Sequence, residues 1–245
     1  MQKEAKKNKT HIFWPLYTKE GDRVFNSAVL IGPDGAIIGN YHKMHPTVGE
    51  IEGGCMPDDE ASVFETDFGK VGACICFDIN FPDVLYGLKD NGAEVIFFCS
   101  AFKGGRWVQY WGLQLGCYMV SAVASELGQI VDQGGRVLAT STYECLVARS
   151  INLNSRLLHM DYNWDKMDAM YRKYGSAVSF EYYTPEAVYT VASEKKGLDV
   201  DALIQEFGLE ERADYWVRAS QVRDKWLRKI GKKPGDTIRK FQHSR

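Results

Sequence analysis

The sequence lacks a long hydrophobic run. No apolar stretch reaches the roughly 18 residues that a membrane-spanning helix requires. Charge of one sign is not in excess either, because 30 Lys and Arg residues stand against 32 Asp and Glu residues, for a formal net charge of −2. This balance gives no reason to expect nucleic acid as a partner. We therefore expect neither a membrane nor a nucleic-acid partner.

A disulfide framework is not expected. The first nine residues hold no apolar core of the kind found in a secretion signal, so we expect a cytoplasmic protein. In that compartment the six cysteines are expected to be free thiols. Four of them lie in or beside strongly apolar segments: Cys74, Cys76, Cys99 and Cys117.

What the sequence does contain is typical of a globular α/β protein. Apolar residues make up 45% of the chain and charged residues 25%. Segments with strand periodicity alternate with helical ones. We expect strands at 10–17, 25–31, 36–40, 63–68, 70–76, 95–99, 118–124, 129–132, 136–140 and 145–151, and helices within 1–9, 82–91 and 106–117. Residues 41–53 are expected to form a polar loop.

The hydrophobic period changes after residue 154. A mostly apolar stripe from Leu157 to Tyr174 predicts one long helix. Short strands at 178–183 and 188–192 and helices at 200–207 and 211–228 are expected next, before a basic tail that we expect to be solvated. We therefore divide the chain into residues 1–153, one α/β domain, and residues 154–245, the C-terminal part of that domain with a helical extension and the tail.

The segment most informative about chemistry is 70–83. A strand of small and β-branched residues runs into Cys76, turns sharply and enters a helix at Pro82. Backbone amides at such a junction favour a thiolate and can hold an oxyanion. Two other interpretations stay open. One is a buried cysteine that packs as a small hydrophobe, which we adopt for Cys74; the other is a Cys-x-Cys metal half-site, although no second Cys/His cluster has ligand spacing.

Several motifs in order resemble the carbon–nitrogen hydrolases of the nitrilase/amidase superfamily. The nucleophile region of that family is similar to Ile75-Cys76-Phe77-Asp78 followed by Phe81-Pro82-Asp83, and residues 39–47 resemble the segment that carries its catalytic lysine. Residues 25–35, 92–102 and 135–139 resemble the neighbouring strands, loop and hairpin. The resemblance runs from about residue 5 to about residue 153. It implies the α-β-β-α sandwich, two sheets face to face with helices outside.

The resemblance also implies roles for individual residues. Cys76 is the nucleophile, and Lys43 stabilises the developing charge together with the backbone N–H of Phe77. Glu50, seven residues after Lys43, matches a further glutamate that some branches place in the site, and Glu52 is the alternative. The segment after the next strand places two more residues on the substrate side: Ala101 and Phe102.

The implied reaction is hydrolysis of a non-peptide C–N bond through a thioester, without metal or organic cofactor. Phe77-Asp78 stands where nitrile-hydrolysing members usually carry Trp-Glu, which favours an amide or carbamoyl-amide substrate over a nitrile. Asn80 stands where many amidase-like members have Arg, so a carboxylate-bearing substrate is not carried over from them. A homodimer or higher homo-oligomer is the family expectation.

One part of the family's machinery is not assigned. Its general-base glutamate lies in a strand–loop unit that precedes the strand equivalent to 10–17, and no such unit is found; Glu4 is the sole carboxylate there. A positioned base contributes roughly 10²–10⁴-fold to rate. We expect either that Met1 is an internal residue of a longer enzyme that lacks its first strand–helix unit here, or that the chain is a pseudo-enzyme acting as a binding or scaffold protein. A thiol redox or metal protein that uses Cys74 and Cys76 is a third alternative.

Overall fold

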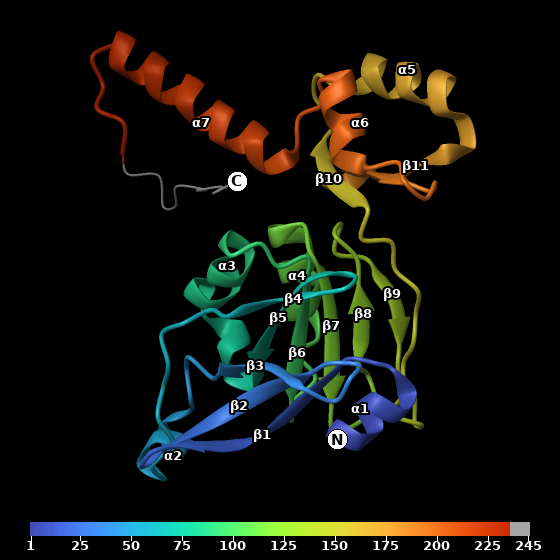
Figure 1. Cartoon of the computed structure of the whole chain (residues 1–245). Helices are drawn as coiled ribbons and strands as arrows, with labels where there is room; N and C mark the ends of the chain where they lie inside the picture. The colour runs from blue at the N-terminus through green and yellow to red at the C-terminus, as the bar shows by residue number, and fades with distance from the viewer. Residues whose placement is uncertain (236–245) are drawn as a thin grey trace. The chain divides into compact units, whose positions relative to one another are not determined.

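The computed structural model describes residues 1–235 and divides the chain into two compact units, Met1–Leu153 and the residues from Asn154 onward (Figure 1). Each unit has a β-sheet and a hydrophobic core of its own. The first unit contains the residues that sequence motifs connect with catalysis. The two units are described separately.

The first unit begins with a helix and a three-stranded antiparallel sheet. Helix α1 (Gln2–Asn8) precedes β1 (Ile12–Glu20), β2 (Arg23–Ile31) and β3 (Ile37–His42). Side chains alternate between the faces of a strand, so β2 turns Val29 and Ile31 to one face and Ala28 and Leu30 to the other. Ala5 of α1 packs with Val29 and Ile31. Helix α1 therefore covers the outer face of this sheet.

A second sheet has the order β4-β5-β6-β7-β8-β9. Its strands are β4 (Val63–Thr66), β5 (Gly69–Ile75), β6 (Val95–Ser100), β7 (Tyr118–Val123), β8 (Gln129–Val131) and β9 (Val137–Thr140). The central strands β5, β6 and β7 are parallel. Parallel neighbours need a crossover connection, which the helices α3 (Pro82–Asp90) and α4 (Arg106–Leu115) provide.

Strand β5 shows how the layers stack. Val71 packs in one cluster with Leu30 of the first sheet. A side chain added at Gly72 would instead meet Leu88 of α3, so the opposite face of β5 meets the helices. The order of layers is α1, first sheet, second sheet, then α3 and α4; Figure 1 shows the two sheets as separate blue and green layers. The predicted α-β-β-α sandwich is confirmed.

Two predictions for the first unit are wrong in detail. The polar loop expected at 41–53 contains the end of β3 and a short helix, α2 (Val48–Glu52), which Thr47 and Glu50 cap. The strand expected at 145–151 is not formed; these residues have no regular structure and Leu146 is 75% exposed. Alternation of apolar and polar residues makes a strand only where a neighbouring strand supplies hydrogen bonds, and none pairs with this segment among the described residues.

The second unit is a three-stranded antiparallel sheet packed on helices. Its strands, in the order β10-β12-β11, are β10 (Ser155–His159), β12 (Val188–Ser193) and β11 (Val178–Tyr183). The helices are α5 (Trp164–Tyr174), α6 (Val200–Phe207) and α7 (Arg212–Lys229). Short 3₁₀ turns lie at Gly175–Ala177 and Thr184–Glu186. Leu158, Met170, Tyr189 and Leu203 are fully buried members of the core.

The long helix expected across residues 157–174 is shorter than predicted. Leu157 and Leu158 belong to β10, where they pair with Thr190 and Tyr189 of β12. The helix begins only at Trp164, after Asn163. Pairing of β10 with β12, which is distant in sequence, therefore decides the structure of the first part of the apolar stripe. The basic tail runs on into residues 236–245, outside the described residues.

Candidate active site

Cys76 lies where β5 ends. Strand β5 stops at Ile75 and a 3₁₀ helix, Cys76–Asn80, begins at the cysteine. The φ angle of Cys76 is 52°, in the left-handed region, which costs a non-glycine residue roughly 1–2 kcal/mol. Backbone strain of this kind persists where the surrounding structure imposes it and is common at functional sites. The turn leaves Cys76 partly exposed at the head of the strand.

A buried carboxylate, Asp78, holds this turn in place. Its Oδ2 atom accepts hydrogen bonds from the backbone N–H of Ile75 at 2.9 Å and from the hydroxyl of Tyr41 at 2.8 Å. Its Oδ1 atom accepts the N–H of His45 at 2.8 Å. Burial raises the pKa of Asp78, and the three donors act against that rise. Asp78 thus ties the cysteine turn to β3 and to the segment that follows Lys43.

Lys43 follows directly after β3 and is almost completely buried. Its side chain is 2% exposed, and its Nζ atom lies 2.6 Å from Oε2 of Glu50. Its backbone N–H donates to the carbonyl of Asn26 in β2 at 2.8 Å. A buried ammonium needs a paired anion, and Glu50 supplies it. The Lys43 side chain is therefore fixed in one direction.

Glu50 is held by two further donors around its carboxylate. Besides Lys43, the side-chain amide of Asn26 donates to Oε1 at 2.7 Å and the N–H of Thr47 donates to Oε2 at 2.7 Å. The Thr47 hydroxyl in turn accepts the N–H of Glu50, which completes a capping box at the start of α2. Burial raises the pKa of Glu50, but these hydrogen bonds and the charge of Lys43 outweigh it and lower the pKa to about 2. Glu52, the alternative from sequence, is exposed.

Cys76, Lys43, Glu50 and Ala101 line one cavity of about 450 Å³. Its lining from β5, β6 and β7 includes Ile75, Cys99 and Ala122, which lie side by side because Ile75 pairs with Cys99 and Cys99 pairs with Ala122 across the parallel ladders. The remaining lining residues are Pro15, Asn26, Thr47, Ser100 and Ala124. The cavity lies between the buried Lys43–Glu50 ion pair and a wall of small, mostly apolar residues.

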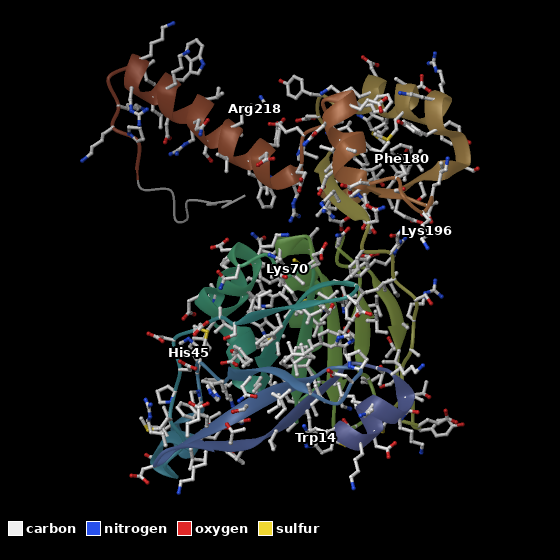
Figure 2. The ribbon with its side chains drawn as sticks, in the orientation of Figure 1. Trp14, His45, Lys70, Phe180, Lys196 and Arg218 are labelled. Atoms are coloured by element: carbon white, nitrogen blue, oxygen red, sulfur yellow. The ribbon has the colours of Figure 1, made fainter. Side chains whose placement is uncertain are left out.

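The side chains of Phe77 and Phe102 are not among the lining residues. Phe77 is 38% exposed and packs edge-on against Phe81. Phe102 packs edge-on against Phe98. The ring of His45, labelled in Figure 2, stacks on the ring of Phe81 with 3.8 Å between the ring centroids. The role expected of Phe77 belongs to its backbone N–H, so this placement affects its side chain alone.

Sequence reasoning missed three residues that organise the site: Asn26, Thr47 and Asp78. The Thr47-x-x-Glu50 spacing is a capping-box signature and could have located both α2 and the correct glutamate. Asn26 carries no comparable local signal, because its partner Glu50 lies 24 residues away. Asp78 has one local partner, the N–H of Ile75, but its other two partners lie 33 and 37 residues away.

Carboxylates and metal-ligand clusters are few around this cavity. Glu50 is the one Asp or Glu among its lining residues. Across residues 1–235, no group of three or more His, Cys, Asp or Glu side chains is arranged to hold a metal ion. The described helices also include none that is long and apolar enough to cross a membrane.

Curated relatives match the first part of the chain. It is 37% identical over 92 residues to the probable hydrolase YhcX of Bacillus subtilis, covering 36% of this chain and 18% of that protein. It is 34% identical over 121 residues to β-ureidopropionase of Arabidopsis thaliana, covering 46% and 30%. It is 28% identical over 120 residues to deaminated glutathione amidase of Homo sapiens, covering 42% and 37%. The chain therefore spans less than two fifths of the length of these relatives.

Solved structures show the same fold. An amidase from Nesterenkonia sp. superposes with a TM-score of 0.54 at 17% identity, over 58% of this chain and 60% of that one. A carbon–nitrogen hydrolase from Helicobacter pylori superposes with a TM-score of 0.52 at 21% identity, over 58% and 61%. The sequence model of the carbon-nitrogen hydrolases matches residues 1–143, more than half of the 245 residues. The chain belongs to the carbon–nitrogen hydrolase family.

Proposed function

We propose that the first unit hydrolyses a non-peptide C–N bond with Cys76 as nucleophile. The observation that carries the proposal is the shared cavity, which puts a strained, partly exposed cysteine together with a buried lysine. The Cys76 sulfur attacks the amide carbon, the C–N bond breaks, and ammonia or an amine leaves with a proton. Water then cleaves the thioester, which releases a carboxylic acid and restores the thiol.

Lys43 stabilises the oxyanion that forms during the attack. Its ammonium is already fixed by Glu50, so it needs no rearrangement when negative charge develops on the substrate oxygen. The backbone N–H of Phe77 is the second proposed donor to that oxygen. Glu50 acts in this scheme as a positioning residue for Lys43. With a pKa of about 2 it stays ionised and is a weak proton acceptor at neutral pH.

An amide or carbamoyl-amide is the proposed substrate class. Relatives of this chain include proteins named deaminated glutathione amidase and β-ureidopropionase. Amide hydrolysis needs one attack, one leaving amine and one water, which fits a cavity with one partly exposed thiol and one buried lysine. Ala101 lines the cavity and is proposed to contact the substrate, as is the Phe102 segment beside it.

A second candidate is a catalytically incomplete protein that binds amides. It is favoured by one observation: Glu50, the carboxylate among the described lining residues, accepts hydrogen bonds from Lys43, Asn26 and Thr47 and is therefore no free base. Such a protein retains a reactive thiol but lacks turnover.

The decisive experiment follows ammonia release from a panel of amides and N-carbamoyl amino acids, with intact-mass detection of acyl adducts. Cys76→Ala is compared with Cys145→Ala, which removes an exposed thiol outside the cavity. Turnover that Cys76→Ala abolishes and Cys145→Ala preserves supports the hydrolase. An acyl adduct on Cys76 without turnover supports the incomplete protein. Turnover that survives Cys76→Ala refutes the assignment of the nucleophile.

We also propose a cytoplasmic homo-oligomer. All six cysteines lie within the described residues as free thiols, which fits a reducing compartment. Light scattering coupled to gel filtration would measure the assembly; a mass equal to one 27.7 kDa chain at every concentration would contradict it.

A further inference from the structure

Cys99 is a second thiol on the wall of the cavity, and the proposed hydrolysis does not use it. It lies on β6 directly opposite Ile75 of β5 in the parallel ladder, and Cys76 is the next residue after Ile75. Both Cys76 and Cys99 line the cavity. The left-handed turn at Cys76 accounts for this, because simple strand alternation would send its side chain to the face opposite Ile75.

Regular strand geometry sets the Cα separation expected for Cys76 and Cys99. Neighbouring strands lie about 4.8 Å apart, and consecutive Cα atoms about 3.8 Å apart. A residue one step beyond the partner of Cys99 therefore has its Cα roughly 6 Å away. Disulfides span Cα separations of roughly 4.4–6.8 Å. The estimated separation falls within this range and permits a bond between Cys76 and Cys99.

Their surroundings assign different roles to the two sulfurs. Cys76 is partly exposed, so a small oxidant reaches it from the open side of the cavity. Cys99 is 4% exposed, and burial raises its pKa to about 12. A buried, protonated thiol reacts slowly with oxidants from solvent. The first oxidation therefore occurs at Cys76, and Cys99 reacts afterwards with the oxidised Cys76.

We propose that Cys76 and Cys99 form a reversible disulfide when a hydroperoxide enters the cavity. In the first step the Cys76 sulfur attacks the terminal peroxide oxygen, the O–O bond breaks, and an alcohol or water leaves with the thiol proton. In the second step the Cys99 sulfur attacks the resulting Cys76 sulfenic acid, the S–O bond breaks, and hydroxide leaves with the Cys99 proton as water. Two electrons pass from the sulfurs to the peroxide.

The disulfide protects the cysteine and blocks the cavity reaction at the same time. It prevents the irreversible steps to sulfinic and sulfonic acid, and a dithiol restores Cys76. Cys74 offers no equivalent path. It is fully buried on the face of β5 that also carries Gly72, where the neighbouring side chain is Leu88 of α3. Cys74→Ala is therefore the matched control for Cys99→Ala.

The test treats the full chain with hydrogen peroxide and maps peptides without reduction. In the natural sequence the denatured thiol count is expected to fall from six to four, with a Cys76–Cys99 crosslink two hydrogens lighter than the separate peptides. Dithiothreitol restores the thiol count and the reaction of Cys76 with iodoacetamide. Cys74→Ala retains the crosslink. Cys99→Ala instead accumulates the Cys76 sulfenic acid, which dimedone captures.

Three outcomes would overturn the proposal: a dimedone adduct on Cys76 of the natural sequence without a crosslink, a crosslink from Cys76 to Cys74, or a peroxide-induced loss of Cys76 reactivity in Cys99→Ala that dithiothreitol reverses without any adduct. The readouts are masses and thiol counts. The result therefore stands or falls separately from C–N bond hydrolysis.

Discussion

The Lys43–Glu50 pair is expected to make the free energy of unfolding depend on pH in the acid range. The carboxylate of Glu50 is 18% exposed and accepts hydrogen bonds from Lys43, Asn26 and the backbone of Thr47. Its pKa falls from 4.5 to about 2 on folding. A carboxyl group with a depressed pKa stabilises the fold above its unfolded pKa, and that stabilisation is lost as pH falls towards the folded value.

We therefore expect Glu50→Gln to flatten the pH dependence of unfolding. Between about pH 5 and pH 2 the natural sequence loses up to about 3 kcal/mol that Glu50→Gln does not lose. Urea unfolding at each pH measures this difference. Glu52→Gln changes an exposed carboxylate in the same helix and is the control. Equal slopes for Glu50→Gln and the natural sequence would contradict the pairing of Glu50 with Lys43.

Asp78 is expected to stabilise the fold because its carboxylate accepts hydrogen bonds from three donors. Asp78→Ala leaves the Tyr41 hydroxyl and the N–H groups of Ile75 and His45 without their acceptor, at roughly 1–3 kcal/mol for each orphaned group. The turn at Cys76 loosens as well, so alkylation of Cys76 by iodoacetamide changes in rate. Denaturant unfolding and alkylation kinetics measure both effects. Asp83→Ala, which removes an exposed carboxylate 58% accessible to solvent, is expected to change neither by more than a small amount.

Some of these residues could be found from sequence and others could not. Cys76 and Lys43 each lie in a contiguous sequence motif, so the resemblance to the carbon–nitrogen hydrolases is enough to identify them. The choice between Glu50 and Glu52 rested on the spacing from Lys43, and the capping box that begins at Thr47 is a local signal that could have supported it. Two of the three partners of Asp78, Tyr41 and His45, lie 37 and 33 positions away, so no short window of sequence contains the whole set.

At the scale of elements, the two sheets of the first unit approach each other closely at Gly39 of β3. A Cβ atom placed there would lie 2.4 Å from the ring of Phe64 in β4. Gly39→Ala is expected to destabilise the fold by about 1–3 kcal/mol, since overpacking forces side chains and backbone to shift. Gly49→Ala in α2, which meets nothing within 4 Å, is expected to leave stability unchanged or raise it by up to ~1 kcal/mol. Thermal unfolding of both variants makes the comparison.

The elements that sequence predicts well are those with their own start and stop signals. Helix α3 begins at Pro82 and ends before Asn91, and α6 spans the predicted residues. The wrong predictions lie in segments whose structure depends on whether a neighbouring strand pairs with them. Residues 155–159 have a helical stripe but join β12, and residues 145–151 alternate without finding a partner. Strand formation is set by neighbours that can be distant in sequence.

At the scale of the whole molecule, each of the two units has a main hydrophobic core among residues 1–235. One is built from β2, β3, the second sheet and helices α3 and α4; the other is built from β10–β12 with α5 and α6. The residues of the proposed site all belong to the first unit. We therefore propose that the geometry of the site depends on the first core and that residues 154–235 form an extension with an interior of their own.

Removing one side chain from each core tests this separation. Leu88→Ala in the first unit and Leu203→Ala in the second delete fully buried leucines, each expected to cost about 2–5 kcal/mol. Calorimetry is expected to show a lowered transition in each variant. Iodoacetamide labelling of Cys76 below that transition is expected to change with Leu88→Ala, since Leu88 packs against Gly72 of β5, the strand that leads into Cys76. It is expected to stay at the natural rate with Leu203→Ala. If Leu203→Ala alters labelling as much as Leu88→Ala does, the second core supports the site directly and the two units do not act independently.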